Sequence, residues 1–191
     1  MKLTFDPSLH EYRVDGARVP GVTSVLRPLV DFSRVPPAVL EAKADLGRRV
    51  HLACQYHDEH DLDESSVEAE VAPYLTAYRR FLVDTGAEVI ENERQVFNRV
   101  HRYAGTLDRV LYLRGEFWLV DLKTSITTPI TVGPQTAAYM HAIEDVPLRH
   151  RAALRLRPDG TYRLDELHNP NDWSTFLAAL TLHRYAEMHE A

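Results

Sequence analysis

Three strand-like segments that follow one another closely constrain this chain most, because short turns limit how they can pair. The segments cover about residues 88–98, 103–113 and 116–123, and each is rich in β-branched, aromatic or leucine residues. Arg114-Gly115 is the tight turn between the second and third segments. The middle of the chain therefore predicts an antiparallel sheet core.

The segments around this core predict helices and further strands. Residues 1–35 are expected to form an N-terminal β-meander followed by a short helix that Thr23-Ser24 can cap, and residues 36–86 a helical segment. After the core, the pattern predicts a helix, two strands and a closing helix, over 134–144, 152–157, 162–167 and from Trp173. The predicted fold class is α/β, an α+β sandwich with helices flanking a central mixed β-sheet, in a single domain over 1–191.

Two helices are expected within the segment 36–86. The first follows Pro36-Pro37, which a helix N-terminus tolerates, and places His51 on one face with Leu40, Ala44, Gly47 and Cys54. The second has apolar spacing from Val67 and stops at Gly86. On the helical pattern alone, His51 is best explained as a core histidine that bonds a backbone carbonyl.

Composition excludes several classes of function. The 22 Lys and Arg residues are outnumbered by 28 Asp and Glu, and the net charge of −6 means that any nucleic-acid role needs a local basic surface and metal ions. The single cysteine, Cys54, excludes an intramolecular disulfide and a four-cysteine cage for zinc or an iron–sulfur cluster. No window approaches the roughly 18 apolar residues of a membrane span, so a cytoplasmic protein is expected.

Charged side chains stand in the middle of two predicted core strands, where burial is costly unless something compensates it. Asp108 lies in the second strand, and Asp121 lies thirteen residues later in the third, with Lys123 on the same face by two-residue alternation. The hairpin brings the two aspartates to neighbouring positions, where they repel unless a cation lies between them. Magnesium suits such carboxylates together with a phosphate. Leu122 turns its side chain away and leaves its carbonyl free toward the metal.

The order of these residues resembles a known enzyme family. Gly105-x-x-Asp108 is followed by Asp121-x-Lys123-Thr124-Ser125 and by Gln135-x-x-x-Tyr139, with Gly47-x-x-x-His51 upstream. This arrangement is similar to the PD-(D/E)xK nuclease superfamily, in its RecB-like exonuclease branch, and to phage-encoded and mitochondrial genome-maintenance exonucleases of that branch. The stretch from Tyr12 to Leu26 is similar to the opening of phage members.

The resemblance implies a restriction-endonuclease-like core and roles for single residues. It implies that Asp108, Asp121 and Lys123 are catalytic, and that the metal ligands are His51, Asp108, Asp121 and the carbonyl of Leu122. It also implies Mg²⁺ as cofactor, with Mn²⁺ able to substitute, and no iron–sulfur cluster. The residues expected to contact DNA, from the motif or from their suitability for phosphate oxygens, are Gln135, Tyr139, Thr124, Ser125, Arg48 and Arg49.

The expected function is a divalent-metal-dependent DNA exonuclease in phage or bacterial repair, recombination or replication. It is expected to act on the DNA backbone and ends without reading sequence, with a recombination or replication protein as a further partner. A structure-specific endonuclease of the same fold, or a non-catalytic nucleic-acid-binding subunit, is the alternative. Glu91 and Glu93 precede the metal strands, but strand-edge glutamates are mostly solvated, so the site is expected without them.

Overall fold

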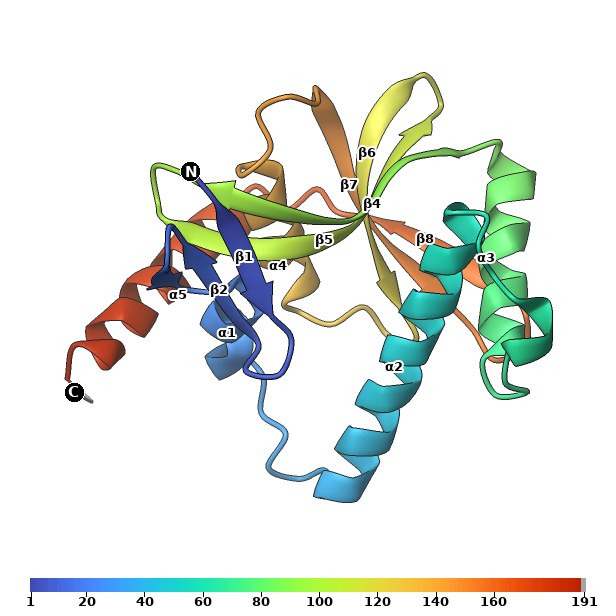
Figure 1. The fold of residues 1–191 in the computed structure, drawn as a ribbon, viewed down its shortest axis with the longest axis horizontal. Helices are drawn as coiled ribbons and strands as arrows, with labels where there is room; N and C mark the ends of the chain where they lie inside the picture. The colour runs from blue at the N-terminus through green and yellow to red at the C-terminus, as the bar shows by residue number, and fades with distance from the viewer. Residues whose placement is uncertain (190–191) are drawn as a thin grey trace.

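The computed structural model describes residues 1–189, and its central feature is a five-stranded mixed sheet, which is seen in Figure 1. Neighbouring strands run antiparallel except for one parallel pair, β6 and β7. In sheet order the strands are β4 (Glu88–Asn98), β5 (Tyr103–Leu113), β6 (Glu116–Lys123), β7 (Leu148–Leu156) and β8 (Tyr162–Glu166). With helices on both sides of this sheet, the predicted α+β fold is confirmed.

Helices cover both faces of the sheet (Figure 1). On one face, α2 (Pro37–Asp58) and α3 (Ala72–Thr85) pack over a core that includes Leu111, Leu122 and Leu154. On the other face, α1 (Val22–Leu26), α4 (Val132–Met140) and α5 (Asp172–Glu187) share a second core with strand residues such as Leu107 and Val110. No helix among residues 1–189 is long and apolar enough to span a bilayer.

A second, three-stranded antiparallel sheet is formed by β1 (Leu3–Asp6), β2 (Glu11–Val14) and β3 (Ala17–Val19). It attaches to the central sheet where β5 begins. The amide of Ala104 donates to the Pro20 carbonyl at 2.9 Å, and the hydroxyls of Tyr12 and Thr106 lie 2.9 Å apart. The N-terminal segment therefore lies against the same stretch of β5 that carries Gly105 and Asp108.

The central hairpin follows the sequence closely. β4, β5 and β6 cover the residues expected for them, and Arg114 and Gly115 adopt the two positive φ angles, 55° and 84°, of a tight turn between right-twisted strands. Helix α2 begins at Pro37, directly after Pro36, as the sequence predicts.

The ends of four elements differ from the prediction. Helix α3 begins at Ala72 rather than near Val67, because Pro73 occupies its first turn and a proline deeper in a helix would break it. The N-cap position of α1 is Gly21 rather than Thr23 or Ser24, and no side chain bonds the first amides of the helix. The Thr23 hydroxyl instead lies within hydrogen-bond distance of His10 Nε2, at 3.2 Å. Helix α4 and strand β7 cover 132–140 and 148–156 instead of 134–144 and 152–157.

Candidate metal site

Strands β5 and β6 separate at the predicted aspartates. Arg109 pairs with Val120, and at the next position the Asp108 carboxylate takes over from the backbone ladder. Its Oδ2 accepts a hydrogen bond of 2.7 Å from the amide of Leu122. Strand β6 meanwhile stays paired with β7 through Asp121 and Lys123. The Asp108 side chain is thus fixed in the opening between two strands.

Asp121 is a buried acid with a cation beside it. Its Oδ1 accepts a hydrogen bond of 2.9 Å from Gln135 Nε2, and its Oδ2 forms an ion pair with the Lys123 ammonium, which confirms that the two side chains share a face. Burial raises the pKa of Asp121 to about 6, although Lys123 pulls it down. Burial alone would lower the pKa of Lys123, but the charges of Asp121 and Asp108 outweigh it and raise that pKa. Lys123 is therefore an ammonium ion at neutral pH.

His51, on α2, reaches across to this opening. Its Nε2 lies 3.1 Å from the Leu122 carbonyl, and its Nδ1 lies 3.7 Å from Asp108 Oδ2 and 3.9 Å from Glu93 Oε1. Because a carbonyl can only accept, the contact at Nε2 requires the proton there and leaves the lone pair of neutral His51 on Nδ1. The Leu122 carbonyl accepts this hydrogen bond and keeps a second lone pair, so its role as a metal ligand stays a prediction. The Leu122 side chain is buried in the core beneath α2 and α3.

Glu93, which was expected to be solvated, joins this group. One ligand atom each from His51, Glu93 and Asp108 can be chosen so that all lie within 4.8 Å of one another. Glu93 has a φ of 44°, uncommon for a non-glycine residue in a strand. Burial, and then the Asp108 charge, raises the pKa of Glu93 to about 7. Glu91, by contrast, pairs with Arg94 at 2.8 Å and stays outside the group.

The donor set fits a divalent cation. Two carboxylate oxygens and one imidazole nitrogen face one another in a partly buried place. Lys123 is paired with Asp121, and Glu93 has only a 3.2 Å contact with Arg109, so the carboxylates of Asp108 and Glu93 are incompletely compensated. Two such charges repel each other, and the raised pKa of Glu93 expresses that cost together with burial. A divalent ion between them would remove the repulsion, and carboxylate oxygens are ligands that Mg²⁺ and Mn²⁺ accept.

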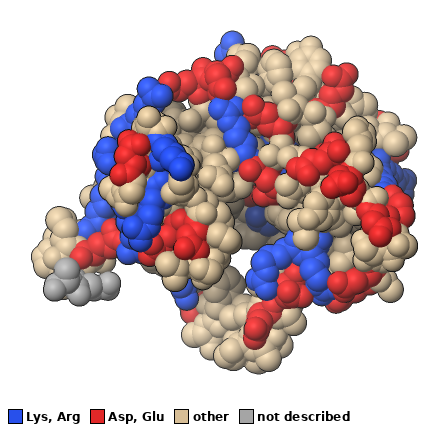
Figure 2. Space-filling model, viewed as in Figure 1, with Lys and Arg blue, Asp and Glu red and all other residues tan. Residues whose placement is uncertain are grey.

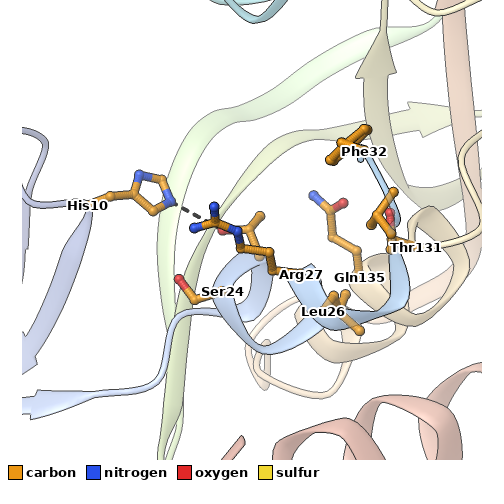
Figure 3. Close-up of a pocket in the computed structure, with 9 residues that line it drawn as sticks. His10, Ser24, Leu26, Arg27, Phe32, Thr131 and Gln135 are labelled. Carbon is orange, nitrogen blue, oxygen red and sulfur yellow. Dashed lines mark hydrogen bonds between the residues drawn. The ribbon is translucent and has the colours of Figure 1, made fainter. Parts of the chain in front are cut away.

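The site opens into a cleft of about 750 Å³ between α2, the N-terminal sheet and α4. Figure 2, which shows the molecule in the orientation of Figure 1, has a hollow on this face with acidic and basic side chains interspersed around it. A smaller pocket of about 300 Å³ adjoins the cleft and shares His10, Thr23 and Gln135 with it. Figure 3 shows Gln135 in this pocket, below the Phe32 ring and beside Leu26 and Thr131.

The residues expected to contact DNA are placed unequally. Gln135 lines the cleft between Asp121 and the Tyr139 hydroxyl, which lies 3.4 Å from its Nε2, and Tyr139 is itself buried. Arg48 also lines the cleft and is largely exposed, with Asp45 at 3.2 Å. These three side chains therefore line the cleft beside the candidate metal site.

Three others are directed elsewhere or lie at its margin. The Arg49 guanidinium is engaged by Asp45, Glu68 and Glu70, on the side of α2 away from the cleft. The Ser125 hydroxyl donates to the Thr127 carbonyl at 2.7 Å, within its own loop. Thr124 follows Lys123 and lies next to Gly47 of α2. The sequence did not reveal Glu68 and Glu70 as partners of Arg49, because they are 19 and 21 residues away along the chain.

Gly105 is required by the close approach of Tyr139. A Cβ at this position would lie 2.5 Å from Tyr139 Cε1 and 3.2 Å from Val22 Cγ2, and neither side chain can swing into solvent because both are buried. We expect Gly105→Ala to lower the free energy of unfolding by about 1–3 kcal/mol through overpacking, measured by denaturant unfolding. Gly47→Ala is the control, because its Cβ meets nothing closer than 3.8 Å and a helix interior favours alanine. Equal stability of Gly105→Ala and the wild type would contradict this close contact.

Comparison with known proteins adds little to these observations. No known protein family matches the chain, and no curated protein matches it. Among solved structures, the crystal structure of an alkaline exonuclease, LHK-Exo from Laribacter hongkongensis, is similar with a TM-score of 0.39 and 14% identity, over 75% of this chain and 84% of that chain. At that identity and TM-score, the likeness establishes neither a shared family nor a shared activity.

Proposed function

We propose that this protein is a divalent-metal-dependent nuclease that hydrolyses DNA phosphodiester bonds, and that it acts as an exonuclease. The observation that carries the proposal is the convergence of His51, Glu93 and Asp108 beside the Asp121–Lys123 pair at the wall of an open cleft. Carboxylates gathered this closely repel one another and lower the stability of the fold, so their presence together favours a functional role such as binding a cation. The sequence pattern of Asp108, Asp121 and Lys123 supports the same chemistry.

Each residue has a part in such a reaction. His51, Glu93 and Asp108, with Asp121 adjacent, would hold Mg²⁺ or Mn²⁺, and a bound ion would stabilise negative charge on the phosphate and lower the pKa of water. Lys123 is protonated, so it can donate a hydrogen bond to a phosphate oxygen and stabilise the negative charge there. Gln135 orients Asp121, and the Leu122 amide orients Asp108. Water attacks phosphorus and releases a proton to solvent, one ester P–O bond breaks, and the leaving oxygen takes up a proton from solvent.

The test uses Asp108→Asn, which keeps an oxygen for the Leu122 amide but loses the charge. We expect the wild type to degrade end-labelled linear DNA in Mg²⁺ or Mn²⁺ and not in EDTA. We expect the variant to be at least about a thousandfold slower, because a ligand to the ion has lost its charge. Melting curves of both proteins show whether the variant is folded.

Circular single-stranded DNA separates the alternatives. An exonuclease leaves it intact because it has no end, whereas an endonuclease of the same fold linearises it. DNA binding without cleavage in any divalent ion would instead identify a non-catalytic nucleic-acid-binding subunit. Equal cleavage by the wild type and Asp108→Asn would overturn the assignment of this site.

A further inference from the structure

A buried guanidinium lies directly behind the candidate metal site. Arg109 is 0% exposed, and its Nε lies 2.6 Å from Asp58 Oδ2 at the end of α2. The Tyr78 hydroxyl, from α3, donates to both oxygens of Asp58 at 2.9 and 3.0 Å and accepts from Arg109 Nε at 3.3 Å. Charges this deeply buried persist only when they are paired and hydrogen-bonded. Asp58 and Tyr78 provide these partners.

The other end of the same guanidinium faces the site. Arg109 Nη1 donates to Glu93 Oε1 at 3.2 Å and to the carbonyl of Asp108 at 2.6 Å. One side chain therefore touches two of the three residues in the His51, Glu93 and Asp108 group. Glu93 needs such a contact more than Asp108 does, because Asp108 is already held by the Leu122 amide.

The same contacts set how α2 sits along β5. Asp58 follows His51 by seven residues, which is two helical turns on one side of α2, and Arg109 directly follows Asp108 in β5. The helix and the strand are thus joined twice, by the Asp58–Arg109 pair and by the approach of His51 to Asp108.

We propose that Arg109 is a positioning residue, anchored by Asp58 and Tyr78, that sets the Glu93 carboxylate beside His51 and Asp108. The inference rests on the proposed metal-dependent function. Asp58 also keeps the guanidinium from pairing fully with Glu93, which would leave that carboxylate neutralised and poorly available to a cation. Without the Asp58 charge, Arg109 competes with the metal ion for Glu93.

Asp58→Asn tests this role, because it keeps the shape of the side chain and removes its charge. The measurement is Mn²⁺ binding to the full chain without DNA, by isothermal titration calorimetry. We expect binding to weaken about 10- to 100-fold, as for other groups that orient metal ligands. The control is Asp172→Asn, which breaks a comparably buried pair with Arg151 at 3.1 Å, at residues outside the site. It should lose thermal stability to a similar extent and bind Mn²⁺ as the wild type does.

A second measurement ties the effect to Glu93. In a Glu93→Gln background, adding Asp58→Asn should weaken Mn²⁺ binding less than twofold further, because Asp58 acts through the carboxylate already removed. If Asp58→Asn does not fold, Tyr78→Phe removes one donor to Asp58, keeps the ring, and should weaken binding a few-fold.

The outcomes separate this inference from the proposed function. The positioning role alone is overturned if Asp58→Asn binds Mn²⁺ as tightly as the wild type does. It is also overturned if Asp172→Asn weakens Mn²⁺ binding as much as Asp58→Asn does. Mn²⁺ binding that responds to Asp58→Asn in a protein that cleaves no DNA overturns the nuclease and keeps the positioning role. Absence of Mn²⁺ binding by the wild type overturns both.

Discussion

Lys123→Met is expected to reduce DNA cleavage at least about a thousandfold, because a preorganised charge beside the reacting phosphate contributes several kcal/mol to catalysis. The substitution removes the ammonium that contacts Asp121 and keeps an unbranched side chain of similar length. Asp121 then loses the charge that holds its pKa down against burial, and it takes up a proton near neutral pH. The chain should remain folded, because a neutral Asp121 still accepts from Gln135.

The measurement is the rate of cleavage of end-labelled DNA under single-turnover conditions, with folding checked by circular dichroism. Lys2→Met is the control, since Lys2 is exposed near the N-terminus, and it should cleave at the wild-type rate. Lys123→Arg should not restore the rate, because a planar guanidinium does not replace a compact ammonium between Asp121 and a phosphate. Cleavage by Lys123→Met at the wild-type rate would remove the lysine from the reaction.

The sequence predicted the parts of the site that local rules control. The turn at Arg114-Gly115 sets the hairpin, and the two-residue alternation of a strand is enough to put Asp121 and Lys123 on one face. Helical spacing likewise places Gln135 and Tyr139 on one side of α4, where Gln135 contacts both Tyr139 and Asp121. These relationships depend on at most a few neighbouring residues, so they can be inferred from the sequence alone.

Glu93 shows what the same rules left out. The pairs Asn92 with Arg109 and Arg94 with Leu107 put Glu93 opposite Asp108. The sequence predicted both strands but not the register between them. The assumption that strand-edge glutamates are solvated decided against it. That assumption fails here because the positive φ at Glu93 and the buried Arg109 turn its carboxylate toward the site, and neither feature has a local sequence signal.

Arg49 and Leu122 show the limit for long-range contacts. Arg48 and Arg49 are adjacent and chemically alike, yet one lines the cleft and the other is engaged by Glu68 and Glu70. The angle at which α2 crosses the sheet decides this, and it follows from the packing of whole cores. For the same reason the helical pattern could indicate that His51 bonds a backbone carbonyl, but not that this carbonyl belongs to Leu122.

Glu93→Gln is expected to stabilise the metal-free protein above neutral pH. The pKa of Glu93 is raised from 4.5 to about 7, so the folded state disfavours its charged form. The wild type should therefore lose stability as the pH rises from about 4.5 to about 7, with Glu93 accounting for about 3 kcal/mol at 1.4 kcal/mol per pKa unit. Glutamine does not titrate, so the variant avoids this loss. The raised pKa of Asp121 also lowers stability as the pH rises, but it does so in both proteins and therefore cancels in the difference between their free energies of unfolding.

Manganese should reverse the order of stability. A cation that binds only the folded state stabilises the wild type in proportion to its affinity, and Glu93→Gln has lost a ligand and gains little. Denaturant unfolding at pH 5 and pH 8, in EDTA and in Mn²⁺, measures both effects. Glu91→Gln is the matched control, because Glu91 pairs with Arg94 and lies outside the ligand group. The stability of this variant should be lower than that of the wild type by the same small amount in every condition. If Glu93→Gln is the less stable protein in EDTA at pH 8, Arg109 compensates the Glu93 charge fully, and the site is then an ion pair of the fold rather than a place held ready for a metal ion.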